Sequence, residues 1–114
     1  VRQIEALPAP VDCVPAIAEA VGKRMTILYD SGVRSGVDVA RAIALGADAA
    51  LAGKAFLWSL GALGERGPGH MLRSVLDELR ASLGQLGCPT VGDLRDVPVR
   101  HPGAWRAEDF RARG

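Results

Sequence analysis

The pattern of hydrophobic positions predicts helices that alternate with two short strands. Residues 13–21 carry apolar side chains on one helical face, and Asp12 precedes them where a helix N-cap is expected. Residues 25–29 form an apolar run without alternation, which is typical of a buried strand in a parallel sheet. Residues 49–52 form a second, shorter run of the same kind.

Further helices follow each predicted strand. Ser35 and Asp38 have the spacing of a capping box at the start of a helix that is predicted to end at Gly46, and another helix is predicted over 55–63. The longest predicted helix covers 68–86 and has an apolar stripe made of Leu72, Val75, Leu76, Leu79, Leu83 and Leu86. This alternation predicts an α/β fold built from parallel βα units.

The length of 114 residues allows one domain with a modest core. We assign the βα units to residues 1–95, where Thr90 would cap a short helix over 91–95. Residues 96–114 are polar and contain prolines, which predicts a C-terminal tail. The chain starts at Val1 without a methionine, so we expect a truncated or processed product.

The charge balance argues against several kinds of partner. A formal charge of +1, from 14 basic and 13 acidic residues, gives no general reason to bind nucleic acid or an anionic membrane. Asp48 and Lys54 interrupt the apolar stretch 44–64, so two short soluble elements are predicted there instead of a membrane span. Cys13 and Cys88 are far apart and have no metal-ligand spacing, which indicates free thiols, no metal site and a cytoplasmic location.

The turn after the first predicted strand combines groups that suit a bound phosphate. Asp30 ends the strand, and Arg34 offers a planar fork of hydrogen-bond donors. Gly32 and Gly36 allow the backbone to approach a ligand closely. In a βα unit such a turn opens onto the N-terminus of the next helix, where unpaired N–H groups favour an anion.

The second predicted unit repeats a glycine and a cation at Gly53 and Lys54. Two adjacent units that converge on one anion are typical of the phosphate site of (β/α)8 barrels. The alternative is that the glycines only shape a turn, that Asp30 caps a backbone group and that Arg34 is a solvated surface charge. Neither a GxGxxG nor a P-loop pattern is present to decide between the two.

Several stretches occur in the order and at the spacing of a known family. They include Arg2-Gln3-Ile4-Glu5, Asp30-Ser31-Gly32-Val33-Arg34-Ser35-Gly36 and Gly53-Lys54-Ala55-Phe56-Leu57. Through these motifs the chain resembles the C-terminal part of the FMN-dependent α-hydroxy acid dehydrogenases and oxidases. The resemblance implies a TIM (β/α)8 barrel that binds FMN at its C-terminal mouth. This chain would supply about two βα units, the seventh and eighth, plus the closing helices.

The resemblance also implies a set of cofactor-binding residues, namely Asp30, Ser31, Gly32, Arg34, Gly53 and Lys54. Asp30 would bind the ribityl hydroxyls of FMN. Gly32 and Arg34 would bind its phosphate, and Gly53 with Lys54 would bind the same phosphate from the other side. The family usually has arginine where this chain has Lys54, which neutralises phosphate without a planar fork.

The implied reaction is the oxidation of a small L-2-hydroxy acid, such as lactate, to the 2-oxo acid. Arg2 matches the arginine that holds the substrate carboxylate. The family's catalytic histidine lies just before the Arg-Gln pair, where this chain has only Val1, and neither His70 nor His101 matches it. No catalytic residue is therefore predicted in the chain, and the isolated chain is expected to be inactive.

Two other interpretations remain open. One is a related FMN-dependent isopentenyl diphosphate isomerase, against which the pair Arg2-Gln3 argues. The other is a non-enzymatic phosphate-binding, FMN-binding or assembly module. Two parallel strands leave two unpaired edges, so we expect association with the remainder of a barrel or with another copy of the chain. The intact enzyme is expected in the cytoplasm or associated with a membrane.

Overall fold

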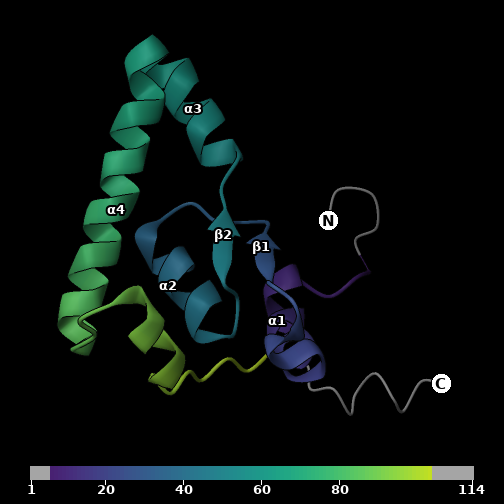
Figure 1. Ribbon diagram of the computed structural model, residues 1–114. Helices are drawn as coiled ribbons and strands as arrows, with labels where there is room; N and C mark the ends of the chain where they lie inside the picture. The colour runs from purple at the N-terminus through teal and green to yellow at the C-terminus, as the bar shows by residue number, and fades with distance from the viewer. Residues whose placement is uncertain (1–5, 104–114) are drawn as a thin grey trace.

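The computed structural model describes residues 6–103 as helices around a small parallel sheet (Figure 1). Residues 1–5 and 104–114 lie outside the described part. The elements in chain order are α1 (Pro10–Val21), η1 (Gly22–Arg24), β1 (Leu28–Asp30), α2 (Gly36–Ala44), β2 (Ala49–Leu51), α3 (Lys54–Leu63), η2 (Gly64–Arg66), α4 (Gly67–Leu86) and η3 (Val91–Asp96). The predicted alternation of helices and strands is confirmed, with parallel pairing of the strands.

The sheet is narrow and covered on one face only. β1 and β2 pair in register from Leu28 opposite Ala49 to Asp30 opposite Leu51. Tyr29 and Ala50 point toward the core formed with α1 and α2, whereas Leu28 is 60% exposed and Leu51 is 48% exposed. Within the described residues, the predicted burial of the strands is therefore met on one face of the sheet. Among the described residues, no element covers the second face.

The start of α1 differs from the prediction. The helix begins at Pro10, because proline in the first turn loses no helical hydrogen bond, and Ala9 is the N-cap without a side-chain cap. Asp12 is not the cap. Its carboxylate instead lies 2.7 Å from Nε2 of His101, so it connects α1 to the segment that follows η3.

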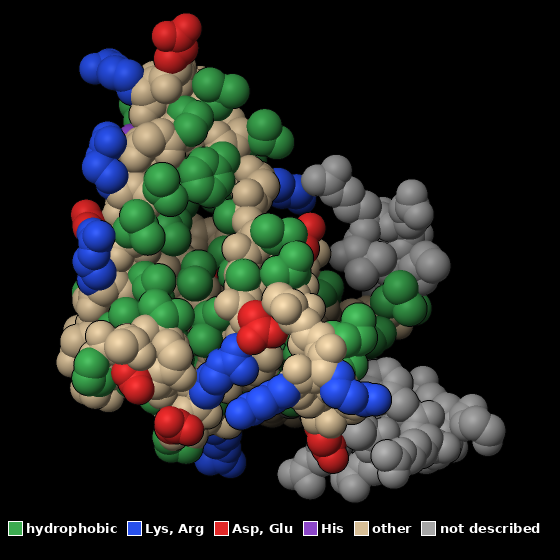
Figure 2. All heavy atoms as spheres, in the orientation of Figure 1, with side chains coloured by type: hydrophobic (Ala, Val, Ile, Leu, Met, Phe, Trp, Pro, Cys, Tyr) green, Lys and Arg blue, Asp and Glu red, His purple; other side chains and the backbone are tan. Residues whose placement is uncertain are grey.

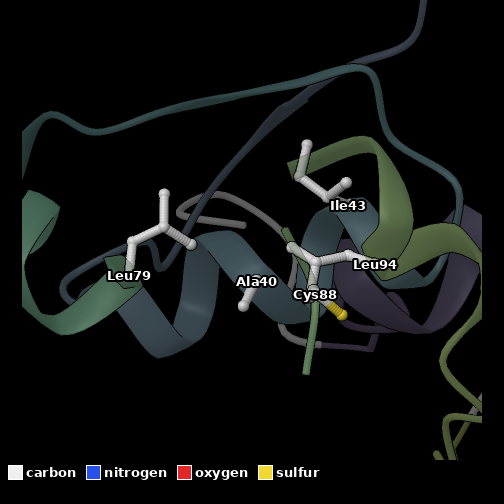
Figure 3. Close-up of a cluster of buried hydrophobic side chains, with 5 residues drawn as sticks. All are labelled: Ala40, Ile43, Leu79, Cys88 and Leu94. Carbon is white, nitrogen blue, oxygen red and sulfur yellow. The ribbon is translucent and has the colours of Figure 1, made fainter. Parts of the chain in front are cut away.

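Helix α2 lies at the centre of the molecule. Ser35 caps it by accepting the Asp38 N–H at 3.1 Å, as the spacing predicted. One face of α2 packs against the sheet and α1. Its other face joins α4 and η3 in a core cluster shown in Figure 3, made of Ala40, Ile43, Leu79, Cys88 and Leu94.

Helices α3 and α4 form a hairpin that projects from the rest of the molecule (Figure 1). Helix α4 ends at Gly87, whose φ of 68° gives the left-handed conformation that stops a helix, as predicted. Its apolar stripe is only partly buried, because Leu79 is in the core while Leu72 and Leu86 are each 49% exposed. Figure 2 shows hydrophobic side chains gathered over α3 and beside it.

The C-terminal part of the described chain returns to α1. A capping box between Thr90 and Asp93 starts η3, which confirms the predicted cap. From η3 the chain continues toward α1, where His101 meets Asp12 (Figure 1). None of the helices between residues 6 and 103 is both long and apolar enough to cross a membrane.

Candidate functional site

A cavity of about 940 Å³ opens at the carboxyl ends of β1 and β2. The turn after β1 and the start of α3 form one part of its wall, and α1, α2 and the segment after η3 form another. The cavity is lined by every predicted cofactor-binding residue, namely Asp30, Ser31, Gly32, Arg34, Gly53 and Lys54. Arg2, the predicted substrate-binding residue, lies outside the described residues.

The turn after β1 has an unusual backbone. Ser31 has a φ of 114° and Gly32 has a φ of 75°. Positive φ suits glycine but is strained for serine, and such strain is concentrated at functional sites. No atom lies within 4 Å of the position that a Cβ would occupy at Gly32 or at Gly53. The backbone of both turns is therefore open to a ligand.

The N-terminus of α2 is already occupied by protein groups. The Gly36 N–H donates to Oε2 of Glu78 at 2.8 Å, and the Arg34 N–H donates to Oδ2 of Asp38 at 3.0 Å. The Asp38 N–H donates to the Ser35 hydroxyl. Carboxylates thus stand where we expected an anion to bind, and they would repel a second anion.

Gly36 has a packing role that the sequence pattern did not indicate. A Cβ at this position would lie 2.3 Å from the Leu79 nitrogen and 2.4 Å from the Val75 oxygen in α4. Glycine is therefore required for the close contact of α2 with α4. The expectation that Gly36 lets the backbone approach an anion was wrong, because α4 fills that space.

The N-terminus of α3, in contrast, is open. Gly53 is its N-cap and supplies no side-chain hydrogen bond. The first N–H groups of a helix have no partner within the helix, so this end carries unsatisfied donors and the positive end of the helix dipole. Lys54 adds a cation at the first helical residue, and Gly53 leaves room for close approach. Of the two helix termini, this one suits a phosphate better.

Arg34 reaches the same region from the turn after β1. Its side chain is exposed, lines the cavity and lies over Trp58, with Cζ 5.2 Å from the ring centroid. Arg41 also lines the cavity, but it pairs with Asp38 at 3.7 Å. Arg100 lines the wall formed by the segment after η3. Arg34 and Lys54 are therefore the cations that the turn after β1 and the start of α3 present to the cavity.

Sequence reasoning missed several residues of the cavity wall, among them Tyr29, Arg100 and His101. Tyr29 directly precedes Asp30, so its position in the strand was the available signal. Burial raises the pKa of its hydroxyl, and the carboxylates of Asp38, Asp12 and Asp30 raise that pKa further. Because the ordinary pKa of tyrosine is already about 10, the hydroxyl stays protonated near neutral pH.

The residues that the segment after η3 adds to the cavity wall could not be predicted from neighbouring sequence, because their position depends on the contact between His101 and Asp12.

Cys13 and Cys88 are free thiols, as predicted, and Cys88 is buried. No group of three or more metal-ligating side chains gathers in the part of the chain that the structure describes.

The structure defines an α/β protein of parallel βα units, and glycines and cations at the carboxyl ends of such strands are typical of phosphate-binding members of this class. Residues 1–101 match the family model described as FMN-dependent dehydrogenase. The chain belongs to this family, whose cofactor is FMN.

Relatives with established names agree with this assignment. The chain is similar to L-lactate dehydrogenase of Serratia proteamaculans, with 43% identity over 93 residues that cover 82% of this chain and 24% of the relative. It is similar to L-lactate dehydrogenase of Pseudomonas paraeruginosa, with 41% identity over 104 residues that cover 90% of this chain and 27% of the relative. The chain thus spans about a quarter of the length of these curated relatives.

Solved structures agree with the fold. A crystal structure of mandelate oxidase with 3,3-difluoro-2-hydroxy-3-phenylpropionic acid superposes with a TM-score of 0.83 at 35% identity, covering 87% of this chain and 30% of that one. A mandelate oxidase variant with a monooxide FMN adduct gives the same TM-score of 0.83 and 35% identity, covering 87% of this chain and 32% of that one.

Proposed function

We propose that this chain forms the FMN phosphate end of a flavoprotein that oxidises a small L-2-hydroxy acid, such as lactate, to the 2-oxo acid. The observation that carries the proposal is the meeting of Asp30, Arg34 and Lys54 around one cavity at the open N-terminus of α3. The family assignment and the lactate dehydrogenase and mandelate oxidase relatives support it, and they favour it over the isomerase alternative.

The residues of the cavity fit FMN chemically. The phosphate would accept hydrogen bonds from the first N–H groups of α3, with Arg34 and Lys54 balancing its charge. Gly32 and Gly53 leave space for that approach, because nothing lies within 4 Å of a Cβ at either position. Asp30 would accept hydrogen bonds from the ribityl hydroxyls. A volume of about 940 Å³ is in the range of cofactor pockets.

The barrel assignment is part of the proposal. We infer that β1 and β2 are the seventh and eighth strands of a (β/α)8 barrel, with α4 among the closing helices. The uncovered face of the sheet, which carries Leu28 and Leu51, would then face the barrel interior. The remaining strands would pair with the free edges of β1 and β2 and complete the cavity wall.

In the proposed reaction, bound FMN supplies a two-electron acceptor. Arg2 would orient the substrate by a bidentate pair with its carboxylate. Two histidines lie in the described chain, and neither is suited to be the base. His70 is exposed on α4 away from the cavity, and His101 follows η3, whereas the resemblance places the family's histidine just before Arg2. We therefore assign the base to a residue outside 6–103.

The reaction is tested with the full-length protein under anaerobic conditions. We expect a yellow protein whose visible flavin absorbance is bleached by L-lactate or another 2-hydroxy acid of a panel that includes glycolate and mandelate. Pyruvate, which is already oxidised, serves as the matched control and should not bleach it. A protein that binds FMN but is bleached by no acid of the panel would contradict the proposed reaction, and one that binds no FMN would contradict the site as well.

A further inference from the structure

Arg34 is held by an aromatic ring instead of a carboxylate. Its Cζ lies 5.2 Å from the centroid of the Trp58 ring, within the distance of a cation–π interaction. Among residues 6–103, the side chain of Arg34 takes part in no ion pair and no hydrogen bond. The nearby Asp38 is engaged by the Arg34 backbone N–H and by Arg41.

This arrangement leaves the guanidinium available for an anion. Among the described residues, the Arg34 side chain donates none of its N–H groups to another residue, so its planar fork of donors stays available. A carboxylate partner would occupy those donors and cancel the positive charge, and a phosphate would have to displace it. The indole ring of Trp58 does neither, so it restrains Arg34 without competing for the ligand.

Packing among the described residues does not account for a tryptophan at this position. The side chain of Trp58 is 56% exposed, and it belongs to neither buried cluster of the described residues. Trp58 follows Lys54 by four residues on α3, so the two side chains lie on the same face of one helix. The helix that presents Lys54 and the open N-terminus thus also carries the ring that holds Arg34.

We propose that Trp58 is a positioning residue for the cofactor phosphate, which acts by holding the guanidinium of Arg34 beside the N-terminus of α3. This inference rests on the proposed function. A free arginine side chain loses conformational freedom when it binds a ligand. Because the ring restrains Arg34 beforehand, less of this freedom remains to be lost when FMN binds.

The test compares FMN with riboflavin, which lacks the phosphate, by titrating the full-length apoprotein and following the quenching of flavin fluorescence. We expect Trp58→Leu to weaken FMN binding about fivefold, the scale of an exposed cation–π contact, and to leave riboflavin binding within about twofold. Trp58→Phe keeps a ring and should restore FMN binding to within about twofold of the wild-type value. Leu57→Ala, at a neighbouring exposed position of α3, is the matched control and should change neither affinity.

A double-mutant cycle separates positioning from a general structural role. If Trp58 acts through Arg34, then Trp58→Leu causes no further loss of FMN affinity in an Arg34→Ala background. Equal losses for FMN and riboflavin, or the same fivefold loss in the Arg34→Ala background, would overturn the inference. A wild-type protein that binds FMN no better than riboflavin would overturn the phosphate site itself. A protein with normal FMN preference and no effect of Trp58→Leu would overturn only the role of Trp58.

Discussion

Gly32 and Gly36 stand four residues apart in one turn and meet different physical requirements. At Gly32 the backbone has a φ of 75° and the surrounding space is open. Gly36 is the first residue of α2, where the space for a Cβ is filled by the backbone of α4. The first glycine therefore serves the conformation of the turn and access to it, and the second serves the packing of two helices.

These roles predict different outcomes for the two alanine variants. Gly36→Ala should lower the free energy of unfolding by about 3 kcal/mol, because α4 must shift to admit the methyl group. Gly32→Ala should lower it by only about 1 kcal/mol, through backbone strain at positive φ. Urea unfolding of the full-length variants measures both values. An unfolding midpoint of Gly36→Ala equal to that of the wild type would contradict the packing role.

The sequence showed the composition of the turn but not this division of roles. Asp30, Gly32 and Arg34 are close neighbours in the sequence, and the structure places all three at one cavity. The requirement at Gly36 comes from α4, and its N–H partner Glu78 is 42 residues away. A contact between such distant segments leaves no periodicity or capping pattern near the glycine, so it could not be predicted locally.

At the level of elements, local capping was predicted better than strand boundaries. The Ser35 cap, the Thr90 capping box and the Gly87 stop are all confirmed, because each depends on groups a few residues apart. β1 begins at Leu28 instead of residue 25, because strand formation depends on its partner β2. Asp12 was misassigned since its partner His101 is 89 residues away.

Asp48 joins the N-terminal ends of β1 and β2, which lie opposite the cavity, to η3. Its carboxylate accepts the Ile27 N–H at 2.7 Å and also binds Arg95. The backbone hydrogen bond from Ile27 and then the Arg95 side chain lower the pKa of Asp48. The ionised form is therefore favoured in the folded state, and its stabilising effect is present above the ordinary aspartate pKa and lost as pH falls through the lowered value.

This linkage predicts a pH-dependent effect of Asp48→Asn. The variant should be less stable than the wild type at neutral pH. The difference should begin to shrink as pH falls below the ordinary aspartate pKa of about 4, and it should disappear as pH falls through the lowered pKa of the folded wild-type carboxylate. Urea midpoints at neutral and acid pH measure it. Asp77→Asn, which removes an exposed pair with Arg80 on α4, is the control and should have little effect at either pH. A difference for Asp48→Asn that stays constant or grows toward acid pH would contradict the linkage.

On the scale of the whole molecule, the described chain leaves much apolar surface uncovered. One face of the sheet carries the exposed Leu28 and Leu51, and α4 carries Leu72 and Leu86, each 49% exposed. The chain also spans only about a quarter of the length of its curated relatives. Both facts support the proposal that the remainder of a barrel covers this surface, because exposed apolar patches are typical of contact sites.

The uncovered surface also explains why sequence patterns could not predict which apolar side chains are buried. The apolar runs predicted buried strands, and the stripe on α4 indicated either a core face or a surface that the rest of a barrel would cover. A run of leucines does not say which partner covers it. In the described chain Leu79 is buried by α2, whereas Leu72 remains exposed. The cavity is also incomplete in the described chain. The turn after β1 and the start of α3 line the end that we propose for the phosphate, and the flavin ring and the substrate would need further walls.

The central claim is that Arg34, Lys54 and the open N-terminus of α3 bind the phosphate of FMN. Its most direct test is the ratio of FMN affinity to riboflavin affinity in the full-length apoprotein and its Arg34→Ala and Lys54→Ala variants. We predict a wild-type ratio of about a hundred or more, since two charge-assisted contacts each contribute about 1.5–3 kcal/mol. The ratio should fall in both variants, and further for Arg34→Ala because the planar fork makes two hydrogen bonds. Equal affinities of the wild type for FMN and riboflavin, or a ratio that neither substitution changes, would contradict the claim.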